Sequence, residues 1–107
     1  MLAGEIKKID EILPKKRKGD KNMEVIVTKE NFKKEVLEAK EVILIDFWAT
    51  WGMPCKRQGV ILEEMAANGV NVGKIDVDEQ PELAAQFGVM SIPTLLIFKD
   101  GKEVERF

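Results

Sequence analysis

The residues of this chain best suited to chemistry lie in one short stretch, FWATWGMPCK, residues 47–56. It holds the single cysteine, Cys55, directly after a proline that predicts the start of a helix. Asp46 comes immediately before the stretch and interrupts the apolar run VILIDFW, residues 42–48. Burial in such a run raises the pKa of a carboxyl group by desolvation. The pattern is typical of the mouth of a redox site, although only one sulfur is present for such chemistry.

The composition excludes much of the ordinary enzyme repertoire. With one cysteine and no histidine, the chain cannot form an intramolecular disulfide, and it lacks the residues of the usual zinc sites, haem ligands and Cys-His nucleophiles. We therefore predict no cofactor and no metal site.

Length and charge indicate a small protein without a strongly charged partner. A chain of 107 residues, 45% of them hydrophobic, has enough apolar surface for one core, so we expect a single globular domain. The formal net charge of −2 favours neither nucleic acid nor an anionic membrane as partner. The longest apolar runs reach about half the length of a membrane-spanning helix, and residues 1–22 are too charged for a secretory signal. We expect a cytoplasmic location.

The N-terminal part of the chain differs from the rest. Residues 1–13 contain Leu2, Ile6, Ile9 and Leu13 at helical spacing with charges between them, which predicts an amphipathic helix. Residues 14–22, PKKRKGDKN, predict a basic linker, because charge runs beside proline and glycine are usually solvated. Nuclear import or nucleic-acid binding by this basic run is the less favoured alternative. The globular domain is expected over residues 23–107.

Within that domain, apolar periodicity predicts strands alternating with helices. The strands are expected at residues 24–28, 42–48, 70–78, 93–98 and 103–107, and the helices at residues 28–40, 54–68 and 80–88. Thr28 is a candidate cap of the first helix, and Asp100-Gly101 predicts a hairpin turn. The expected buried faces comprise Phe32, Val36 and Leu37 on the first helix and Ile61, Leu62, Met65 and Ala66 on the second. The order predicts the α/β class, with a central mixed sheet, mostly parallel but ending in an antiparallel hairpin, covered by helices on both faces.

From about residue 24 to residue 107 the chain resembles the thioredoxin family. The resemblance rests on four motifs in register: IDFWATW, PCK, KIDVDEQPELAAQFGV and SIPTLLIFKDGK. It implies a thioredoxin-like fold and an origin among thiol-disulfide oxidoreductases. The family's turn is Trp-Cys-Gly-Pro-Cys, whereas here it is Trp51-Gly52-Met53-Pro54-Cys55.

That departure removes the residue on which the family's reaction depends. The resemblance implies that the first cysteine, exposed at a helix N-terminus where the dipole favours thiolate, attacks the substrate disulfide. The second cysteine then resolves the mixed disulfide. Gly52 leaves the nucleophile position vacant, and Cys55 holds the resolving position without a partner. We expect dithiol exchange to be lost.

The resemblance implies roles for further residues. Asp46 and Lys74 match an acid and a lysine that assist proton movement to the resolving sulfur; the alternative is a structural ion pair without catalysis. Pro93 matches the family's cis-proline, whose preceding backbone pairs with an extended substrate; the alternative is a proline at the start of an edge strand. The expected substrate groove comprises Trp51, Met53, Pro54, Ile92 and Pro93.

Three functions stay open at this point. The first is a disulfide oxidoreductase by descent that has lost its activity, and the second is a non-redox module that binds an extended protein or peptide in the groove. The third is single-thiol chemistry, in which Cys55 forms a mixed disulfide with glutathione or a partner; it ranks last because a shielded thiol has a raised pKa. The resemblance also implies a thioredoxin reductase as a partner.

The family fold ends in a helix that packs on the sheet, and no counterpart follows Phe107 in this sequence. We expect residues 1–13 to take that place, as in a circular permutant, because nine linker residues span up to about 30 Å when extended. The alternative is an unrelated N-terminal extension on a shortened domain.

Overall fold

A computed structural model describes residues 24–51, 53–67 and 69–107, with the backbone alone for residues 53–55. The helix predicted at residues 1–13, the linker predicted at residues 14–22 and the vacant position Gly52 lie outside the described residues.

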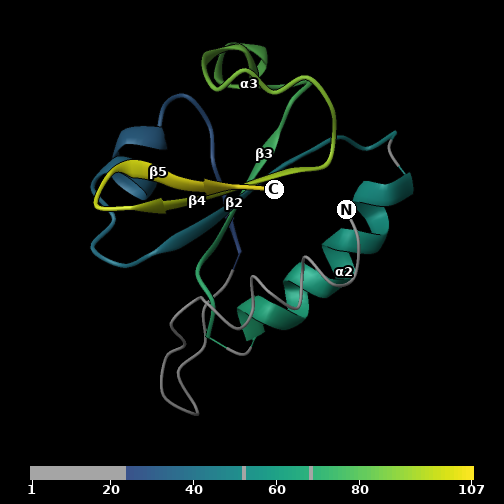
Figure 1. Ribbon diagram of the computed structural model, residues 1–107. Helices are drawn as coiled ribbons and strands as arrows, with labels where there is room; N and C mark the ends of the chain where they lie inside the picture. The colour runs from purple at the N-terminus through teal and green to yellow at the C-terminus, as the bar shows by residue number, and fades with distance from the viewer. Residues whose placement is uncertain (1–23, 52, 68) are drawn as a thin grey trace.

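In the described part of the chain, five strands and three helical segments follow one another in the predicted order (Figure 1). The strands are β1 (Val25–Ile26), β2 (Ile43–Trp48), β3 (Val72–Asp76), β4 (Thr94–Lys99) and β5 (Lys102–Arg106). The helical segments are η1 (Lys33–Leu37), a single π-helical turn, α2 (Met53–Ala67) and α3 (Pro81–Gln86). The α/β class predicted from the sequence is confirmed.

The strands form one mixed sheet in the order β1-β3-β2-β4-β5. β3 pairs in parallel with both β1 and β2, whereas β4 is antiparallel to both β2 and β5. Parallel and antiparallel pairings are therefore equal in number, where a mostly parallel sheet was expected. The turn Asp100-Gly101 joins β4 to β5 with positive φ angles of 53° and 78°, as its sequence predicts.

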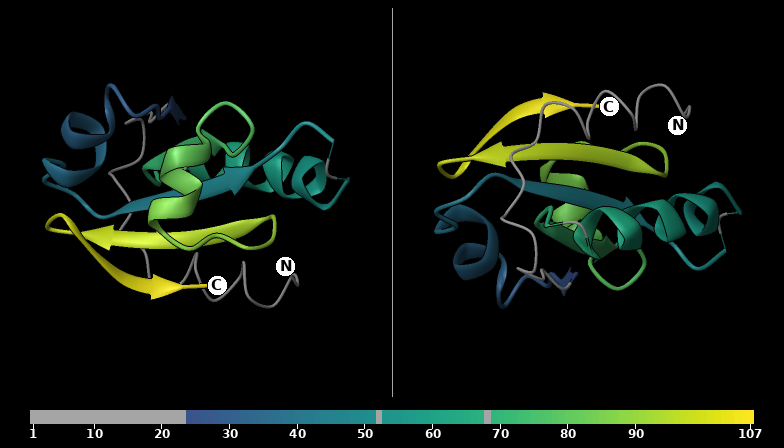
Figure 2. Two further views of the ribbon diagram at one scale, coloured as in Figure 1. Left: turned by 90° about the horizontal axis from the view of Figure 1, so that it is seen from above. Right: turned by 90° about the horizontal axis from the view of Figure 1, so that it is seen from below.

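Helices cover both faces of the sheet, as the two views of Figure 2 show, with α3 in front of the strands in one view and α2 in front in the other. On the α2 side, Leu62, Met65 and Ala66 pack with Leu44 and Leu95. On the opposite side, residues of η1 and α3 pack on the sheet around an aromatic cluster. β2 lies between the two cores, which explains why Ile43 to Phe47 are all buried.

The first predicted helix is much shorter than expected. Thr28 does not cap it; instead the Thr28 N–H donates to Asn31 Oδ1 at 2.7 Å and its carbonyl accepts from the Asn31 N–H, which makes a turn before η1. An asparagine that bonds the local backbone in this way competes with helix formation. η1 buries Val36 but leaves Leu37 42% exposed, so the expectation that Leu37 belongs to the buried face is wrong.

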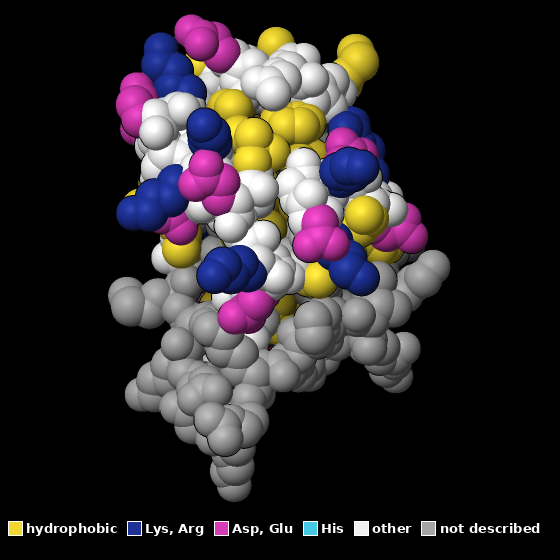
Figure 3. Space-filling view, turned by 90° about the vertical axis from the view of Figure 1, so that its left-hand side faces the viewer, with side chains coloured by type: hydrophobic (Ala, Val, Ile, Leu, Met, Phe, Trp, Pro, Cys, Tyr) yellow, Lys and Arg dark blue, Asp and Glu magenta, His cyan; other side chains and the backbone are white. Residues whose placement is uncertain are grey.

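The surface carries charges of both signs. On the face shown in Figure 3, lysine, arginine and acidic side chains of the described residues are interspersed around a strip of apolar side chains. Within the described residues, none of the helices is long and apolar enough to cross a membrane.

Candidate functional site

The candidate site lies where β2 ends and α2 begins. Trp51, in the turn between them, has a side chain that is 68% exposed. Its indole Nε1–H donates to Asp78 Oδ2 at 2.8 Å. Asp78 is held in turn by its backbone N–H, which donates to Asp76 Oδ1 at 2.8 Å just after β3. Trp51 is therefore exposed, and the hydrogen bond fixes one edge of its ring.

The segment before β4 reaches the same end of the sheet. Phe47 pairs with Thr94 in the antiparallel register, so the residues after Phe47 and those before Thr94 lie at one edge. The peptide bond between Ile92 and Pro93 is cis, as the motif predicts. Both residues are half-buried, whereas Met90, two residues earlier, is 95% exposed. The structure therefore brings the Trp51 turn and the Ile92–Pro93 segment to one end of the molecule.

Asp46 lies in the interior beneath this edge, with an exposed fraction of 0%. Its Oδ1 accepts a hydrogen bond of 3.3 Å from Nε2 of Gln58 on α2, and its Oδ2 is buried without a hydrogen-bond partner. Burial raises the pKa of Asp46 to about 6, and this is partly offset by the positive charge of Lys74 and by the Gln58 hydrogen bond. The raised pKa expected from the sequence is confirmed.

Lys74 is the direct neighbour of Asp46 across the β2–β3 pairing. Its Nζ lies 4.9 Å from the centroid of the Trp48 ring, so the ammonium group makes a cation–π interaction with that ring. Among the ion pairs of the described residues, Lys74 and Asp46 do not form one with each other. The lysine therefore acts on the carboxylate through space, and the tight structural ion pair considered from the sequence is not formed.

Two residues that the sequence analysis missed belong to this group. Gln58 is only 3% exposed, and it shares the helix face of Ile61, Leu62 and Met65, so a polar residue in that apolar stripe was a usable signal. Glu24, just before β1, has a raised pKa through burial, which Lys74 partly offsets. No sequence pattern pointed to Glu24, since its burial depends on the strands beside it.

Several predicted site residues cannot be placed. Gly52 lies outside the described residues, and so do the side chains of Met53, Pro54 and Cys55. Their roles stay predictions.

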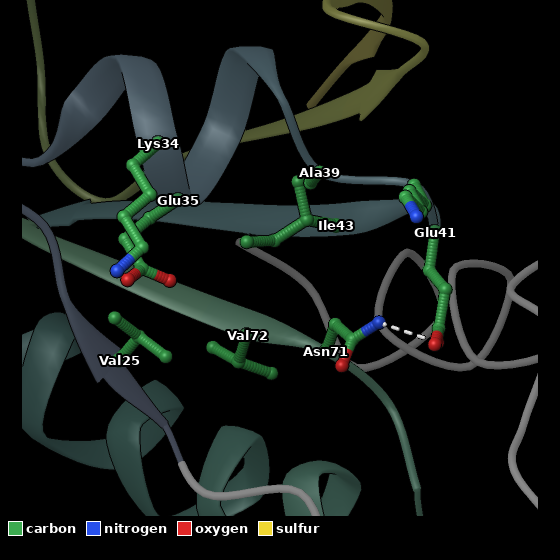
Figure 4. Close-up of a pocket in the computed structure, with 9 residues that line it drawn as sticks. Val25, Lys34, Glu35, Ala39, Glu41, Ile43, Asn71 and Val72 are labelled. Atoms are coloured by element: carbon green, nitrogen blue, oxygen red, sulfur yellow. Dashed lines mark hydrogen bonds between the residues drawn. The ribbon is translucent and has the colours of Figure 1, made fainter.

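A separate cavity of about 230 Å³ lies at the opposite end of β2. Its lining includes Val25, Ile43 and Val72, and Asn71 Nδ2 donates to Glu41 Oε2 at its rim at 2.9 Å (Figure 4). Ile43 begins β2, whereas the candidate site follows Trp48 at its end. The cavity is therefore not part of that site.

Comparison with known proteins gives one consistent result. The sequence model of the thioredoxin family matches residues 23–107. A thioredoxin of Mycobacterium bovis is 47% identical over 91 residues, which cover 82% of this chain and 78% of that protein. A bifunctional thioredoxin reductase/thioredoxin of Mycobacterium leprae is 46% identical over 83 residues, 75% of this chain but 18% of that protein. The crystal structure of a Malassezia sympodialis thioredoxin superposes with a TM-score of 0.71 at 35% identity, covering 82% of this chain and 79% of that one.

Proposed function

This chain belongs to the thioredoxin family, and from that premise we propose that it keeps the family's substrate groove but has lost dithiol exchange. The observation that carries the proposal is the residue at position 52. Glycine stands where the family has its attacking cysteine, and Cys55 is the only sulfhydryl group in the chain.

The proposal follows from the balance of the exchange reaction. In the family's cycle the first thiolate attacks a substrate disulfide, an S–S bond to the enzyme forms, and one substrate thiolate leaves. The second cysteine loses its proton and attacks that mixed disulfide, which closes a ring and releases the second substrate thiol. Two electrons pass to the substrate, and two enzyme sulfurs are needed to supply them. Gly52 has no side chain for the first step, and Cys55 has no partner for the second.

The remainder of the site supports an intact groove. Trp51 is exposed at the edge where the Ile92–Pro93 segment arrives, and Asp46 and Lys74 lie beneath that edge as neighbours across two strands. An extended polypeptide would pair with the backbone before Pro93 and contact Trp51, Met53, Pro54 and Ile92.

Insulin reduction by dithiothreitol, followed as turbidity, tests the loss of exchange. We expect the chain as it stands to match the rate without protein, because with one sulfur it cannot close the enzyme disulfide that releases the reduced substrate. Gly52→Cys is expected to accelerate the reaction, and Gly52→Ser, which adds a side chain without a nucleophilic sulfur, is the matched control. Acceleration by the unchanged chain, or none by the cysteine variant, would refute the proposal.

A second candidate is a binding module that works without any sulfur. The exposure of Trp51 and Met90 beside the Ile92–Pro93 segment favours it, because apolar side chains at one edge suit a peptide contact. Cys55→Ser separates this module from single-thiol chemistry. If the affinity for a peptide, measured by the quenching of tryptophan fluorescence, is unchanged in this variant, the module is supported. If the variant no longer captures a disulfide-containing peptide, the binding is assigned to single-thiol chemistry at Cys55.

Partner and location follow from the same membership. The name of the Mycobacterium leprae relative joins a thioredoxin reductase to a thioredoxin in one chain, which supports a reductase as partner here. Reduction of oxidised Gly52→Cys by a bacterial thioredoxin reductase with NADPH would test this contact. A cytoplasmic location is part of the proposal because free thiols persist in reducing compartments, and cell fractionation checks it.

A further inference from the structure

Three buried oxygen atoms without hydrogen-bond partners gather in one place. Among the described residues, the buried polar side-chain atoms that lack a partner are Glu24 Oε2, Asp46 Oδ2 and Gln58 Oε1. Their clustering calls for a common explanation, since leaving a buried polar group unsatisfied is destabilising.

The sheet register explains why the three residues lie on one side of the sheet. Lys74 on β3 lies between Ile26 of β1 and Asp46 of β2, so these side chains share the α2 side of the sheet. Glu24, two residues before Ile26, alternates onto that same side. Gln58 reaches down from α2 to Asp46, and a methyl group at Gly59 would lie 3.6 Å from Lys74 Nζ, which places the lysine against the helix.

Together, Glu24, Asp46 and Gln58 present more hydrogen-bond acceptors than donors. Gln58 Nε2 already donates to Asp46 Oδ1, and Lys74 Nζ lies over the Trp48 ring. A proton on Asp46 Oδ2 would change this count, because a carboxylic acid adds an O–H donor while its other oxygen still accepts. That O–H can donate to Gln58 Oε1, so that one amide makes two hydrogen bonds with one acid.

We propose that Glu24, Asp46 and Gln58 form a single proton-holding site around Lys74, in which Asp46 carries the proton, Gln58 bonds it, and Glu24 controls its release. Glu24 and Gln58 are positioning residues here, since both act through Asp46. On release the proton passes from the Asp46 carboxyl to solvent and leaves a carboxylate. The inference is independent of the proposed function, because it needs neither the missing sulfur nor a bound peptide.

The charges around Asp46 give the direction of the Glu24 effect. Two charges act on Asp46: the positive charge of Lys74 on β3 and the negative charge of Glu24 at the start of β1. Gln58 of α2 and Leu95 of β4 also face Asp46 but carry no charge. Glu63 of α2 acts on Glu24. One ammonium group cannot fully neutralise two carboxylates, so an ionised Glu24 disfavours ionisation of Asp46. Burial raises the pKa of both carboxyls, which supports a site that retains a proton.

Carbon-13 NMR titration of the Asp46 carboxyl in the full chain tests the role of Glu24. We expect Glu24→Gln to lower the Asp46 midpoint, because it removes a like charge without changing the shape. Glu30→Gln, at an exposed position, is the control and should leave the midpoint unchanged. An unchanged midpoint in Glu24→Gln would overturn the inference, even if the melting temperature moved, since a purely structural role alters stability alone.

The role of Gln58 can be tested without any substitution. Its side-chain amide resonances should titrate with the same midpoint as the Asp46 carboxyl, because the acceptor bond at Oε1 exists only with the protonated acid. Amide resonances that stay constant through that midpoint would contradict the shared proton, whether or not Glu24→Gln folds.

Discussion

Asp46 stands in the middle of β2 with no exposed surface, and the sequence alone was enough to single it out. A charged residue inside an apolar strand is unusual, and burial gives it a pKa of about 6 against an ordinary value of 3.8. The folded protein therefore holds the Asp46 proton more tightly than the unfolded chain does. Stability contributed by this proton is fully present below about pH 3.8 and is lost as the pH rises through about 6.

Asp46→Asn should remove this dependence. The two pKa values differ by about two units, so the variant is expected to exceed the unchanged chain in free energy of unfolding by up to about 3 kcal/mol at pH 8. Near pH 4 the two proteins should be nearly equal. Urea unfolding at both pH values measures the difference.

The control for this comparison is Glu105→Gln on β5, which removes an exposed carboxyl instead of a buried one. It should change the free energy of unfolding by no more than about 0.5 kcal/mol at either pH. An Asp46→Asn variant that is less stable than the unchanged chain at pH 8 would show that the buried carboxylate is better satisfied than its surroundings indicate.

The residues that could be predicted are those with a local signal. Asp46 interrupts an apolar run, Trp51 stands in a turn and Pro93 lies in a recognisable motif. Glu24 was missed because it looks like an ordinary polar residue in its own segment, and Gln58 was missed although a polar residue stands out in the apolar face of α2. Their burial arises only when β1, β3 and α2 are assembled.

Among the elements, β2 and α2 were the most predictable and β1 and η1 the least. The long apolar run of β2 and the regular apolar face of α2 are strong sequence signals, whereas β1 consists of only two residues. At η1, the local hydrogen bond between Thr28 and Asn31 prevails over the apolar spacing of the segment. The periodicity of apolar residues does not predict a tertiary or side-chain contact of this kind.

Two glycines in neighbouring elements should respond in opposite ways to alanine. A methyl group at Gly73 of β3 would lie 2.9 Å from Cδ1 of Ile45 and 3.0 Å from Cγ2 of Val27, so Gly73→Ala should lower the free energy of unfolding by about 1–2 kcal/mol. Gly59 is inside α2, where the new methyl group meets only an ordinary contact at 3.6 Å. Gly59→Ala should raise the free energy of unfolding by about 0.5–1 kcal/mol.

Chemical unfolding of both glycine variants measures these changes. A Gly73→Ala protein as stable as the unchanged chain would mean that Ile45 moves aside without loss of packing, which contradicts the tight contact between β1, β2 and β3.

At the scale of the whole molecule, the core on the α2 side extends beyond α2 to Leu95 and Ile97 of β4 and to Phe107. We propose that residues 1–13 pack along this side, because their apolar spacing suits such a surface. In the full chain, Ile9→Gln should then lower the free energy of unfolding by about 1–2 kcal/mol, since it removes a buried side chain. Lys8→Gln, on the polar face of the same segment, is the matched control.

Thermal and urea unfolding of these two variants distinguishes packing from a free extension. Equal stability of Ile9→Gln and Lys8→Gln would refute the packing and favour an N-terminal extension that does not join the core.

This member of the thioredoxin family has the fold without the first sulfur of the family's reaction. A thiol count tests the consequence: fully reduced protein, freed of reductant, is mixed with a disulfide-linked peptide, and the released peptide thiol is counted. We predict essentially no stable release by the unchanged chain and about two thiols per molecule of Gly52→Cys. Release of two thiols by the unchanged chain, or none by Gly52→Cys, would show that the missing sulfur does not decide the activity.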